Sequence, residues 1–528
     1  MLRWNGYGEE TITYPLSESA RVYFGQTLGS SKRPQDAKRE SLIIPQPYFF
    51  SKSHSLLQTD EETRLRHALG QSFPDLVAKR FGKIQRFPDA VAFPESNQDV
   101  CDLLTWARRA GAQVIPFGGG TSVVGGVNPA KHEMDDRPVL TISLARLNDL
   151  RRLDETSHLA TFGAGTLGPY VEAQLRTHGF TLGHYPQSFE QSSLGGWIAA
   201  RSSGQQSLGY GRIESLFAGG TIETPSGQIT LPAIPASAAG PDLRQLILGS
   251  EGRLGVITEA TVRVRPIPES ETFYGVMLPD WQTGIHIVRH AMQAGIPLSM
   301  MRLSNPTETE VFLHMPAHQN QVELLRTLLN WRHFTSEKCL MLFGITGSRR
   351  IAQLARRMMV DLTHEHHGLW LTKLIGKQWA KTRFRSAYWR DALWELGYAV
   401  ETLETAVSWN MVHKAAEVIL KALSNPVSPI LPMVHLSHFY RDGASLYFTF
   451  LFRVGSTYEE TIDCWRALKE AGCNAIMSVG GTISHQHGVG ADHLPYLESE
   501  KGELGMDVLK NIQKFLDPSN MMNPGKLM

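Results

Sequence analysis

Three consecutive glycines, Gly118 to Gly120, constrain the fold of this 528-residue chain more than any other feature. They follow Val114-Ile115, which we predict to be a short buried strand. Glycine lets a backbone adopt positive φ angles and lie very close to a ligand. Successive N–H groups in such a loop form a concave anion site, to which Thr121 and Ser122 add hydroxyl donors. The loop therefore suits a pyrophosphate, and a plain structural turn is the alternative explanation.

The spacing of these glycines disfavours two common nucleotide-binding folds. It matches neither G-x-G-x-x-G nor the Walker A pattern, so neither a Rossmann domain nor a P-loop is expected. Two further glycine-rich stretches follow, one within residues 183–211 and one within residues 248–260. In order and spacing the three stretches resemble the FAD-binding domain of the p-cresol methylhydroxylase and vanillyl-alcohol oxidase type, over residues 84–268.

This resemblance implies a cofactor and the residues that bind it. In that family the three stretches surround the pyrophosphate, ribose and ring of FAD, and a C-terminal motif similar to residues 515–526 returns to the flavin. We expect non-covalent FAD, because the loop from Gly118 to Gly126 contains no His or Cys. The expected cofactor-binding residues are Pro116, Phe117, Gly118, Gly119, Gly120, Thr121, Ser122, Gly125, Pro186, Ser188, Ser193, Leu194, Gly195, Gly196, Trp197, Ser203, Gly204, Tyr210, Gly211, Glu251, Gly252, Gly255, Val256, Ile257, Asn523 and Lys526.

Composition excludes several classes of partner. The net charge of +1 gives no sign of nucleic-acid binding. No apolar run is long enough to cross a membrane, and no targeting signal is recognisable. The four cysteines are scattered without a C-x-x-C pair, so neither a zinc site nor a disulfide framework is expected. We expect a soluble cytoplasmic protein.

Local patterns predict an α+β fold in several parts. Ser96 and Asp99 form a capping-box pattern before a helix whose apolar face is Val100, Leu103, Leu104 and Ala107. Strand and helix patterns then alternate as far as Pro266 and Pro268, which mark a boundary. We expect an N-terminal segment (1–83) packed on the body, a two-subdomain FAD-binding domain (84–268), an α/β cap domain (269–478) and a C-terminal helical return (479–528).

Motifs along the whole chain resemble a more specific family, the alkyldihydroxyacetonephosphate synthases. The matching stretches outside the glycine motifs are Arg3-Trp4-Asn5-Gly6, Arg302-Leu303, Tyr388-Trp389-Arg390-Asp391, Glu404-Thr405 with Trp409, Asp442-Gly443-Ala444 with Tyr447-Phe448, and Ser484-His485-Gln486-His487-Gly488-Val489-Gly490. The resemblance implies exchange of the acyl chain of acyl-dihydroxyacetone phosphate for a fatty alcohol, without net oxidation. It also implies an adduct between the substrate carbon and flavin N5.

The same resemblance assigns roles to individual residues. Arg302 and Arg390 fall where the family binds the substrate phosphate, which suits the guanidinium fork. Tyr447 matches the catalytic tyrosine, and we expect a cationic neighbour to perturb its pKa so that it can act as a base. His485 and His487 are expected to be catalytic together with Arg390, and they flank a position where the family has a third histidine. Here that position is Gln486, which cannot carry a proton.

Two other functions stay open. A dehydrogenase for a 2-hydroxy acid such as D-lactate or glycolate belongs to the same superfamily. Its metal-site pattern has His where this chain has Tyr447 and Glu where it has Gln486, so we expect no metal. A flavin-fold protein without catalysis that binds lipid is the third possibility, and absence of bound flavin would favour it.

Remaining expectations concern surface histidines and partners. His364-Glu365-His366-His367 is expected to be a solvated helix end and not a metal site. His435 and His438 are three apart on a predicted strand, so they are expected on opposite faces. A lipid or other small-molecule substrate, peripheral membrane contact through that lipid, and a homodimer complete the expected partners.

Overall fold

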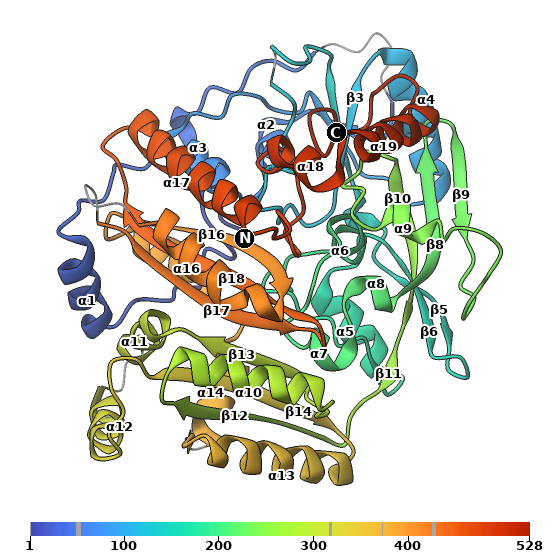
Figure 1. Cartoon of the computed structure of the whole chain (residues 1–528). Coiled ribbons are helices and arrows are strands. Elements are labelled where there is room, and N and C mark those ends of the chain that lie inside the picture. The colour runs from blue at the N-terminus through green and yellow to red at the C-terminus, as the bar shows by residue number, and fades with distance from the viewer. Residues whose placement is uncertain (1, 49–53, 132, 316–318, 372, 425–428) are drawn as a thin grey trace. The chain divides into compact units, whose positions relative to one another are not determined.

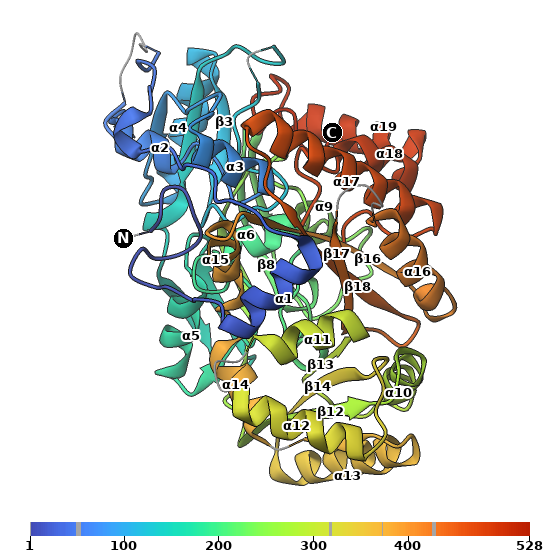
Figure 2. The same cartoon turned by 90° about the vertical axis from the view of Figure 1, so that its left-hand side faces the viewer.

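The computed structural model describes residues 2–48, 54–131, 133–315, 319–371, 373–424 and 429–528. The chain divides into two compact units (Figures 1 and 2). Unit 1 comprises residues 1–35, 205–209 and 268–485, and unit 2 comprises residues 36–204, 210–267 and 486–528. The fold is α+β, as predicted.

Unit 2 contains two main sheets and their covering helices. One sheet has the order β1-β2-β4-β3 with parallel pairing of β2, β4 and β3, and the other is antiparallel with the order β5-β6-β10-β8-β9. A short pair joins β7 to β11. The strands are β1 (Leu57–Gln58), β2 (Ala90–Ala92), β3 (Gln113–Phe117), β4 (Val139–Ser143), β5 (Leu150–Asp154), β6 (Leu159–Gly163), β7 (Phe180–Thr181), β8 (Phe217–Thr224), β9 (Gly227–Leu231), β10 (Val256–Arg263) and β11 (Arg265–Pro266). The helices are α2 (Glu61–Arg66), α3 (Phe73–Phe81), α4 (Asn97–Ala110), α5 (Gly168–Arg176), α6 (Leu194–Ala200), α8 (Ile213–Leu216), α9 (Arg244–Ile247), α18 (Leu494–Lys501) and α19 (Glu503–Leu516).

Helix α4 delivers the chain to the glycine loop. The Ser96 hydroxyl accepts the Asp99 N–H, and the Asp99 carboxylate accepts the Ser96 N–H, which confirms the predicted capping box. The predicted apolar face is fully buried, and the helix packs on both β3 and β8. Gly111 ends the helix with a φ of 66°, which glycine adopts without strain. Strand β3 then runs directly into Gly118.

Unit 1 is built on one seven-stranded antiparallel sheet with the order β15-β12-β14-β13-β17-β18-β16. Figure 2 shows strands β12–β14 between α10 on one side and α12 and α14 on the other. The strands are β12 (Ser270–Leu278), β13 (Met300–Ser304), β14 (Cys339–Gly347), β15 (Leu369–Trp370), β16 (Tyr398–Ser408), β17 (Leu431–Phe439) and β18 (Gly443–Arg453). The helices are α1 (Glu18–Leu28), α10 (Trp281–Gln293), α11 (Pro306–His314), α12 (Gln319–Trp331), α13 (Arg349–Glu365), α14 (Lys373–Thr382), α15 (Trp389–Trp394), α16 (Val412–Ala422) and α17 (Tyr458–Ser478), and α7 (Ser207–Tyr210) begins in this unit.

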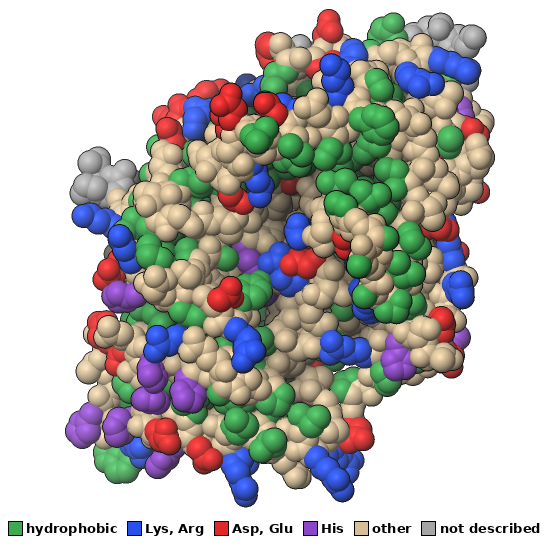
Figure 3. All heavy atoms as spheres, turned by 45° about the vertical axis from the view of Figure 1, so that its right-hand side comes forward, with side chains coloured by type: hydrophobic (Ala, Val, Ile, Leu, Met, Phe, Trp, Pro, Cys, Tyr) green, Lys and Arg blue, Asp and Glu red, His purple; other side chains and the backbone are tan. Residues whose placement is uncertain are grey.

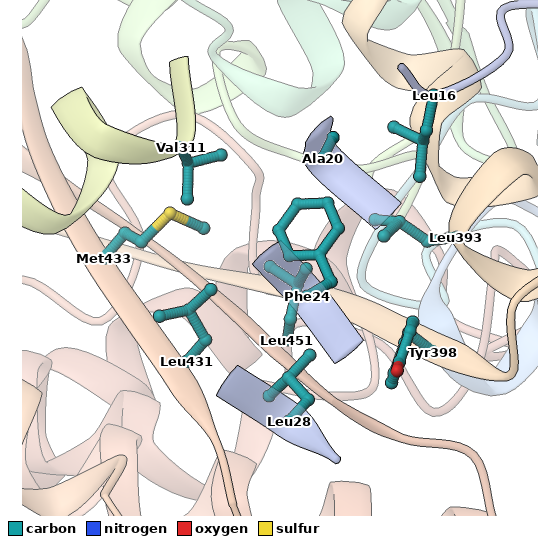
Figure 4. Packing of buried hydrophobic residues seen from close by; sticks show 10 residues of the cluster. All are labelled: Leu16, Ala20, Phe24, Leu28, Val311, Leu393, Tyr398, Leu431, Met433 and Leu451. Atoms are coloured by element: carbon teal, nitrogen blue, oxygen red, sulfur yellow. The ribbon is translucent and has the colours of Figure 1, made fainter. Parts of the chain in front are cut away.

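The N-terminal helix α1 belongs to the core of unit 1. Ala20, Phe24 and Leu28 recur along one side of the helix and are buried against side chains of α11, α15 and strands β16–β18 (Figure 4). Each fully buried large apolar side chain of this kind contributes roughly 1.5–3 kcal/mol relative to an exposed one. The first 35 residues therefore pack on the unit that carries the cap strands, whereas residues 36–83 pack in unit 2.

Candidate functional site

The glycine loop lies directly against the second glycine-rich stretch. A Cβ atom at Gly119 would lie 1.7 Å from the Gln191 carbonyl oxygen, and one at Gly118 would lie 2.2 Å from the Ser193 Oγ. No side chain fits at Gly119, because the opposing atom is backbone and cannot rotate away. Two stretches about seventy residues apart in sequence are therefore held together by glycine.

The other predicted cofactor stretches close around the same region of unit 2. Gly204 approaches the Tyr185 backbone nitrogen so closely that a Cβ would lie 2.6 Å away. Gly183 packs on the Tyr210 ring, and Gly252 packs on Pro116. The N–H groups of Leu194 and Gly195 bond to the carbonyls of Thr166 and Ala164, which fixes the start of α6. Strand β10 begins at Val256 and continues the third stretch through Ile257 into the five-stranded sheet.

The loop offers donors that suit an anionic group. Within the described residues, the N–H groups of Gly119, Gly120 and Thr121 form no hydrogen bond. Gly120 has a φ of 65°, which turns successive N–H groups to one side of the loop. The Ser122 Oγ accepts the Gly126 N–H at 2.9 Å and keeps its own proton to donate. The concave backbone of the loop and these N–H and hydroxyl donors together suit the pyrophosphate of FAD.

The C-terminal tail ties the first and third stretches together. The Val114 N–H donates to the Met521 carbonyl and the Asn523 N–H donates to the Val114 carbonyl, so the tail runs beside β3. The Asn523 Nδ2 donates to the carbonyl oxygens of Gly126, at 2.9 Å, and Glu251, at 2.7 Å. The tail residues expected near the flavin therefore contact two of the three predicted FAD stretches.

Glu251 connects the third stretch to the turn that follows His487. Its carboxylate accepts the N–H groups of Val489, at 2.5 Å, and Gly490, at 2.6 Å. A Cβ at Gly488 would lie 2.9 Å from the same carboxylate, so this turn also depends on glycine. Burial raises the pKa of Glu251 to about 7, against these two hydrogen bonds and Lys526. Burial also lowers the pKa of Lys526 to about 8.

In unit 1 the strand register surrounds Tyr447 with polar partners. Tyr447 on β18 lies opposite Glu404 of β16 on one side and His435 of β17 on the other. The His435 ring stacks on the Tyr447 ring with centroids 5.0 Å apart and planes at 23°. Directly opposed positions in an antiparallel sheet share one face. The predicted catalytic tyrosine therefore stands between a carboxylate and an imidazole.

Arg302 joins this cluster from strand β13. Its Nη2 lies 3.0 Å from the Glu308 Oε1 and 3.1 Å from the His435 Nδ1, and His435 Nδ1 lies 2.9 Å from the same Glu308 oxygen. Burial alone would raise the pKa of Glu308, but Arg302 and His435 together lower it to about 2. Glu308 is therefore ionised, and the pair keeps the Arg302 guanidinium fixed. The buried Arg302 Nε has no hydrogen-bond partner within the described residues, which leaves a donor for a ligand.

Arg390 is positioned by the N-terminal segment. The backbone of Gly6 and Gly8 packs against Asp391 and Tyr388, and the Tyr7 N–H donates to the Asp391 carboxylate. Two of the motifs that carry the family resemblance therefore form one contact. On the other side the Arg390 Nη2 lies 3.8 Å from the Glu401 carboxylate on β16.

The structure corrects the expected protonation of Tyr447. We expected a cationic neighbour to make this side chain a base. Burial, with a smaller contribution from Glu404, instead raises the pKa of Tyr447 to about 12, against the opposing effects of a hydrogen bond with Thr402 and of Arg390. At neutral pH the hydroxyl is therefore protonated.

The expectation that His435 and His438 point to opposite faces is wrong. A β-bulge in β17 shifts the register, so that His435 lies opposite Tyr447 and His438 lies opposite Ser445. Tyr447 and Ser445 are two residues apart on β18 and share a face, so the two histidines do as well. His438 then stacks on His485 with centroids 5.0 Å apart, and His485 Nε2 lies 2.6 Å from the Tyr440 hydroxyl.

Other histidines gather on the surface of unit 1. Figure 3 shows purple side chains at the height of α10 and α13. His286 lies against His366 with ring centroids 4.8 Å apart, and His364 and His366 close helix α13. In the part of the chain that is described, no group of three or more His, Cys, Asp or Glu side chains could hold a metal ion.

Comparison with known proteins identifies the family. A model of the FAD binding domain matches residues 88–231, and a model of the C-terminal domain of FAD linked oxidases matches residues 267–527. The alkyldihydroxyacetonephosphate synthase of Dictyostelium discoideum is 31% identical over 89% of this chain and 78% of its own length. The chain belongs to the alkyldihydroxyacetonephosphate synthase family. The Trypanosoma brucei brucei enzyme of the same name is 30% identical over 95% of this chain and 84% of its own length.

Solved structures agree with this family. One of alkyldihydroxyacetonephosphate synthase superposes with a TM-score of 0.86 at 26% identity and covers 100% of this chain and 99% of that one. The p-cresol methylhydroxylase structure, at 11% identity and a TM-score of 0.70, shares the fold and covers 98% of both chains. A mitochondrial D-lactate dehydrogenase of Arabidopsis thaliana is 26% identical over 89% of this chain and 77% of its own length. The protein is an enzyme, and FAD is its cofactor.

Sequence reasoning missed several members of the site. Glu308 carries no local signal, and Tyr440 follows β17 outside the quoted motifs. The sequence predicts for His435 only a place on a strand, on the opposite face from His438. Glu404 could have been found from the sequence, because it lies in one of the motifs that carry the family resemblance. Its place opposite Tyr447 needed the strand register.

We predict that Gly119→Ala weakens FAD binding and lowers the flavin content of the purified protein. The new methyl group would collide with the Gln191 carbonyl, and forced overpacking costs about 1–3 kcal/mol, which lowers affinity by roughly tenfold or more. Flavin released into the supernatant after acid precipitation of purified protein measures the loss. Gly25→Ala is the matched control, since a Cβ there meets nothing within 4 Å. Equal flavin content in both variants would contradict the assigned cradle.

We also predict that Glu251 makes stability pH-dependent. Its pKa rises from an ordinary 4.5 to about 7 in the folded apoprotein. Its contribution to the free energy of unfolding is therefore fully present below about pH 4.5 and is lost as pH rises through about 7, by at most about 3 kcal/mol. Glu251→Gln cannot ionise, so relative to wild type it should gain stability between about pH 5 and about pH 8 in urea unfolding.

The control for this titration is Glu498→Gln, which removes an exposed carboxylate on α18. Its unfolding free energy should run parallel to that of wild type over the same pH range. Parallel profiles for Glu251→Gln and wild type would refute the raised pKa of Glu251.

Proposed function

We propose that this protein exchanges the acyl chain of acyl-dihydroxyacetone phosphate for a fatty alcohol. The observation that carries the proposal is the cluster on the sheet of unit 1. Tyr447 stands between Glu404 and His435, and Arg302 is held beside them by Glu308. Relatives of this family over most of the chain support the same reaction. The substrate class, acyl-dihydroxyacetone phosphate with a long-chain alcohol, follows from those relatives' name and from the motifs.

Substrate binding is assigned to the two arginines. A guanidinium presents paired N–H donors that match a phosphate, and such charge-assisted bonds are about twice as strong as neutral ones. Arg302 keeps its Nε for this purpose, because Glu308 and His435 engage its Nη2. Arg390 lies on α15, and the Glu401 carboxylate on β16 orients its guanidinium. The two side chains would fix the headgroup while the ester carbon is exchanged.

Tyr447 assists both halves of the exchange through its hydroxyl. In the first half the hydroxyl donates a hydrogen bond to the departing carboxylate as the ester C–O bond breaks, and the fatty acid leaves as its anion. In the second half the Tyr447 Oη takes the proton of the alcohol as the new ether C–O bond forms, while its own proton passes to the fatty-acid carboxylate or to solvent. A pKa of about 12 suits the first step, because the hydroxyl then stays protonated and can donate. When bound, FAD supplies the nucleophilic ring nitrogen on which this exchange depends, and atoms and protons balance without an oxidant.

A 2-hydroxy-acid dehydrogenase is the second candidate. The 26% identical D-lactate dehydrogenase is the observation in its favour. Burial lowers the pKa of His435, so its neutral imidazole is a base for the hydroxyl proton of such a substrate. The two chemistries differ in one respect, because only the second leaves the flavin reduced.

We propose two further properties of the assembly. FAD is held without a covalent bond, since the loop from Gly118 to Gly126 contains no His or Cys. The protein forms a homodimer through α19, which exposes Leu504, Val508 and Phe515 along one side. Acidic residues lie in the first half of that helix and lysines in the second, so an antiparallel copy would be complementary in charge. Sedimentation of Phe515→Ser as a monomer, against a dimeric wild type, would support this interface, and a dimeric variant would refute it.

Tyr447→Phe tests the proposed role of the hydroxyl. Loss of the proton donor should lower exchange of labelled fatty alcohol by at least about 10²-fold, with unchanged flavin content. Tyr398→Phe is the control, because it removes a hydroxyl that only donates to the Gly29 carbonyl. Anaerobic bleaching of wild-type flavin by D-lactate, lost in Tyr447→Phe, would assign the site to hydroxy-acid oxidation instead.

A further inference from the structure

One face of the sheet in unit 1 carries a second polar row beside the row that contains Tyr447. In this second row Ser445 of β18 stands between His438 of β17 and Ala406 of β16. Positions two residues apart on a strand share a face and lie about 7 Å apart. The second row therefore borders the site assigned to Tyr447. The small side chains of Ser445 and Ala406 leave room above it.

The segment after α17 brings His485 to this row. Gly481 lets the segment pass close to β16, because a Cβ there would lie 2.3 Å from the Thr405 Oγ1. The Thr405 hydroxyl donates at 2.8 Å to the carbonyl of the residue after Gly481, and the Ser484 Oγ lies 3.4 Å from the Glu404 Oε1. Thr405 and Glu404 are consecutive on the strand and face opposite ways. The segment thus passes around the edge strand β16 and reaches the face that carries both polar rows.

The imidazole of His485 is held there from two sides. Its ring stacks on the His438 ring with centroids 5.0 Å apart and planes at 27°. Its Nε2 lies 2.6 Å from the Tyr440 Oη, and the His485 side chain is buried. In a neutral imidazole one ring nitrogen donates and the other accepts. A hydrogen-bond partner at Nε2 therefore fixes both the orientation and the tautomer of the ring.

Tyr440 is itself fixed by the hairpin between β17 and β18. Its N–H donates to the Gly443 carbonyl at 2.8 Å. Its carbonyl lies 3.2 Å from the Trp409 Nε1, which also lies 3.1 Å from the Arg441 carbonyl. The Trp409 ring stacks on Phe439. The Tyr440 hydroxyl is thus presented from a backbone that is bonded on both sides.

We propose that Tyr440 is a positioning residue for the exchange reaction and acts through His485. Its hydroxyl holds the His485 imidazole in one orientation and one tautomer beside the Tyr447 site, and His438 supports the face of the ring. His485 is one of the residues expected to be catalytic. A group that is already oriented needs no reorganisation when the reaction occurs, which lowers the barrier.

This inference rests on the proposed exchange and deepens it, because Tyr440 lies outside the motifs that carry the family resemblance. The contact between Tyr440 and His485 can be measured without turnover. Failure of the positioning role and failure of the proposed function are therefore distinguishable.

NMR of FAD-loaded protein with isotope-labelled histidine tests the contact itself. His485→Gln identifies the signals of His485. At alkaline pH, where an imidazole is neutral, the two ring nitrogens of His485 should give well-separated signals, since one tautomer is fixed. In Tyr440→Phe the two signals should approach each other, because exchange between tautomers averages them. Tyr398→Phe is the control and should leave them unchanged, since its hydroxyl donates to the Gly29 carbonyl.

Kinetics of the exchange test the consequence for catalysis. Loss of one hydrogen bond should lower the kcat of Tyr440→Phe by roughly two- to tenfold. The KM for acyl-dihydroxyacetone phosphate and the flavin content should be unchanged, because the substrate and the flavin keep their own contacts. Since Tyr440 acts through His485, Tyr440→Phe should cause no further loss of kcat in a His485→Gln background.

Either of two results would overturn the proposal. In the first, the ring-nitrogen signals of His485 are averaged in wild type, or are the same in Tyr440→Phe as in wild type. In the second, the losses of kcat multiply in the double variant, which would mean that Tyr440 acts independently of His485. If wild type shows no exchange, the proposed function fails, and the NMR comparison still decides whether Tyr440 positions His485.

Discussion

The approach of Gly119 to the Gln191 carbonyl is the contact on which the flavin site of unit 2 depends. It brings the loop after β3 against the segment before α6 at a distance that only glycine permits. Asn523 then bridges the loop to Glu251, and Glu251 holds the backbone that follows His487. Segments from the start, middle and end of unit 2 are thus joined by backbone contacts and a few buried side chains.

In unit 1, charged groups are buried on a largely apolar sheet. Burying one member of an ion pair without its partner costs several kcal/mol. Interactions with Arg302 and His435 offset this desolvation cost for Glu308, which stays ionised. Tyr447 avoids the cost of a buried charge, because its hydroxyl stays protonated.

Local chemistry made much of unit 2 predictable from sequence. The capping box of α4, its buried face and the glycine stop are short-range signals, and all three are confirmed. The role of Glu251 was not predictable as found, because its partners Val489 and Gly490 are more than two hundred residues away. In unit 1 the bulge in β17 inverted the expected relation of His435 and His438. A single inserted residue moves a side chain to the other face, and the sequence carries no period that reveals it. The pKa of Tyr447 depends on burial, which likewise needed the fold.

The central claim is that the flavin site exchanges groups without net oxidation. Release of fatty acid in a single turnover tests it most directly. FAD-loaded protein is mixed anaerobically with acyl-dihydroxyacetone phosphate, without alcohol and without an electron acceptor, and released fatty acid is compared with bound flavin. The account predicts a burst of up to one fatty acid per flavin, and labelled alcohol added afterwards should enter the ether product. Flavin reduced by the substrate with no fatty acid released would contradict it.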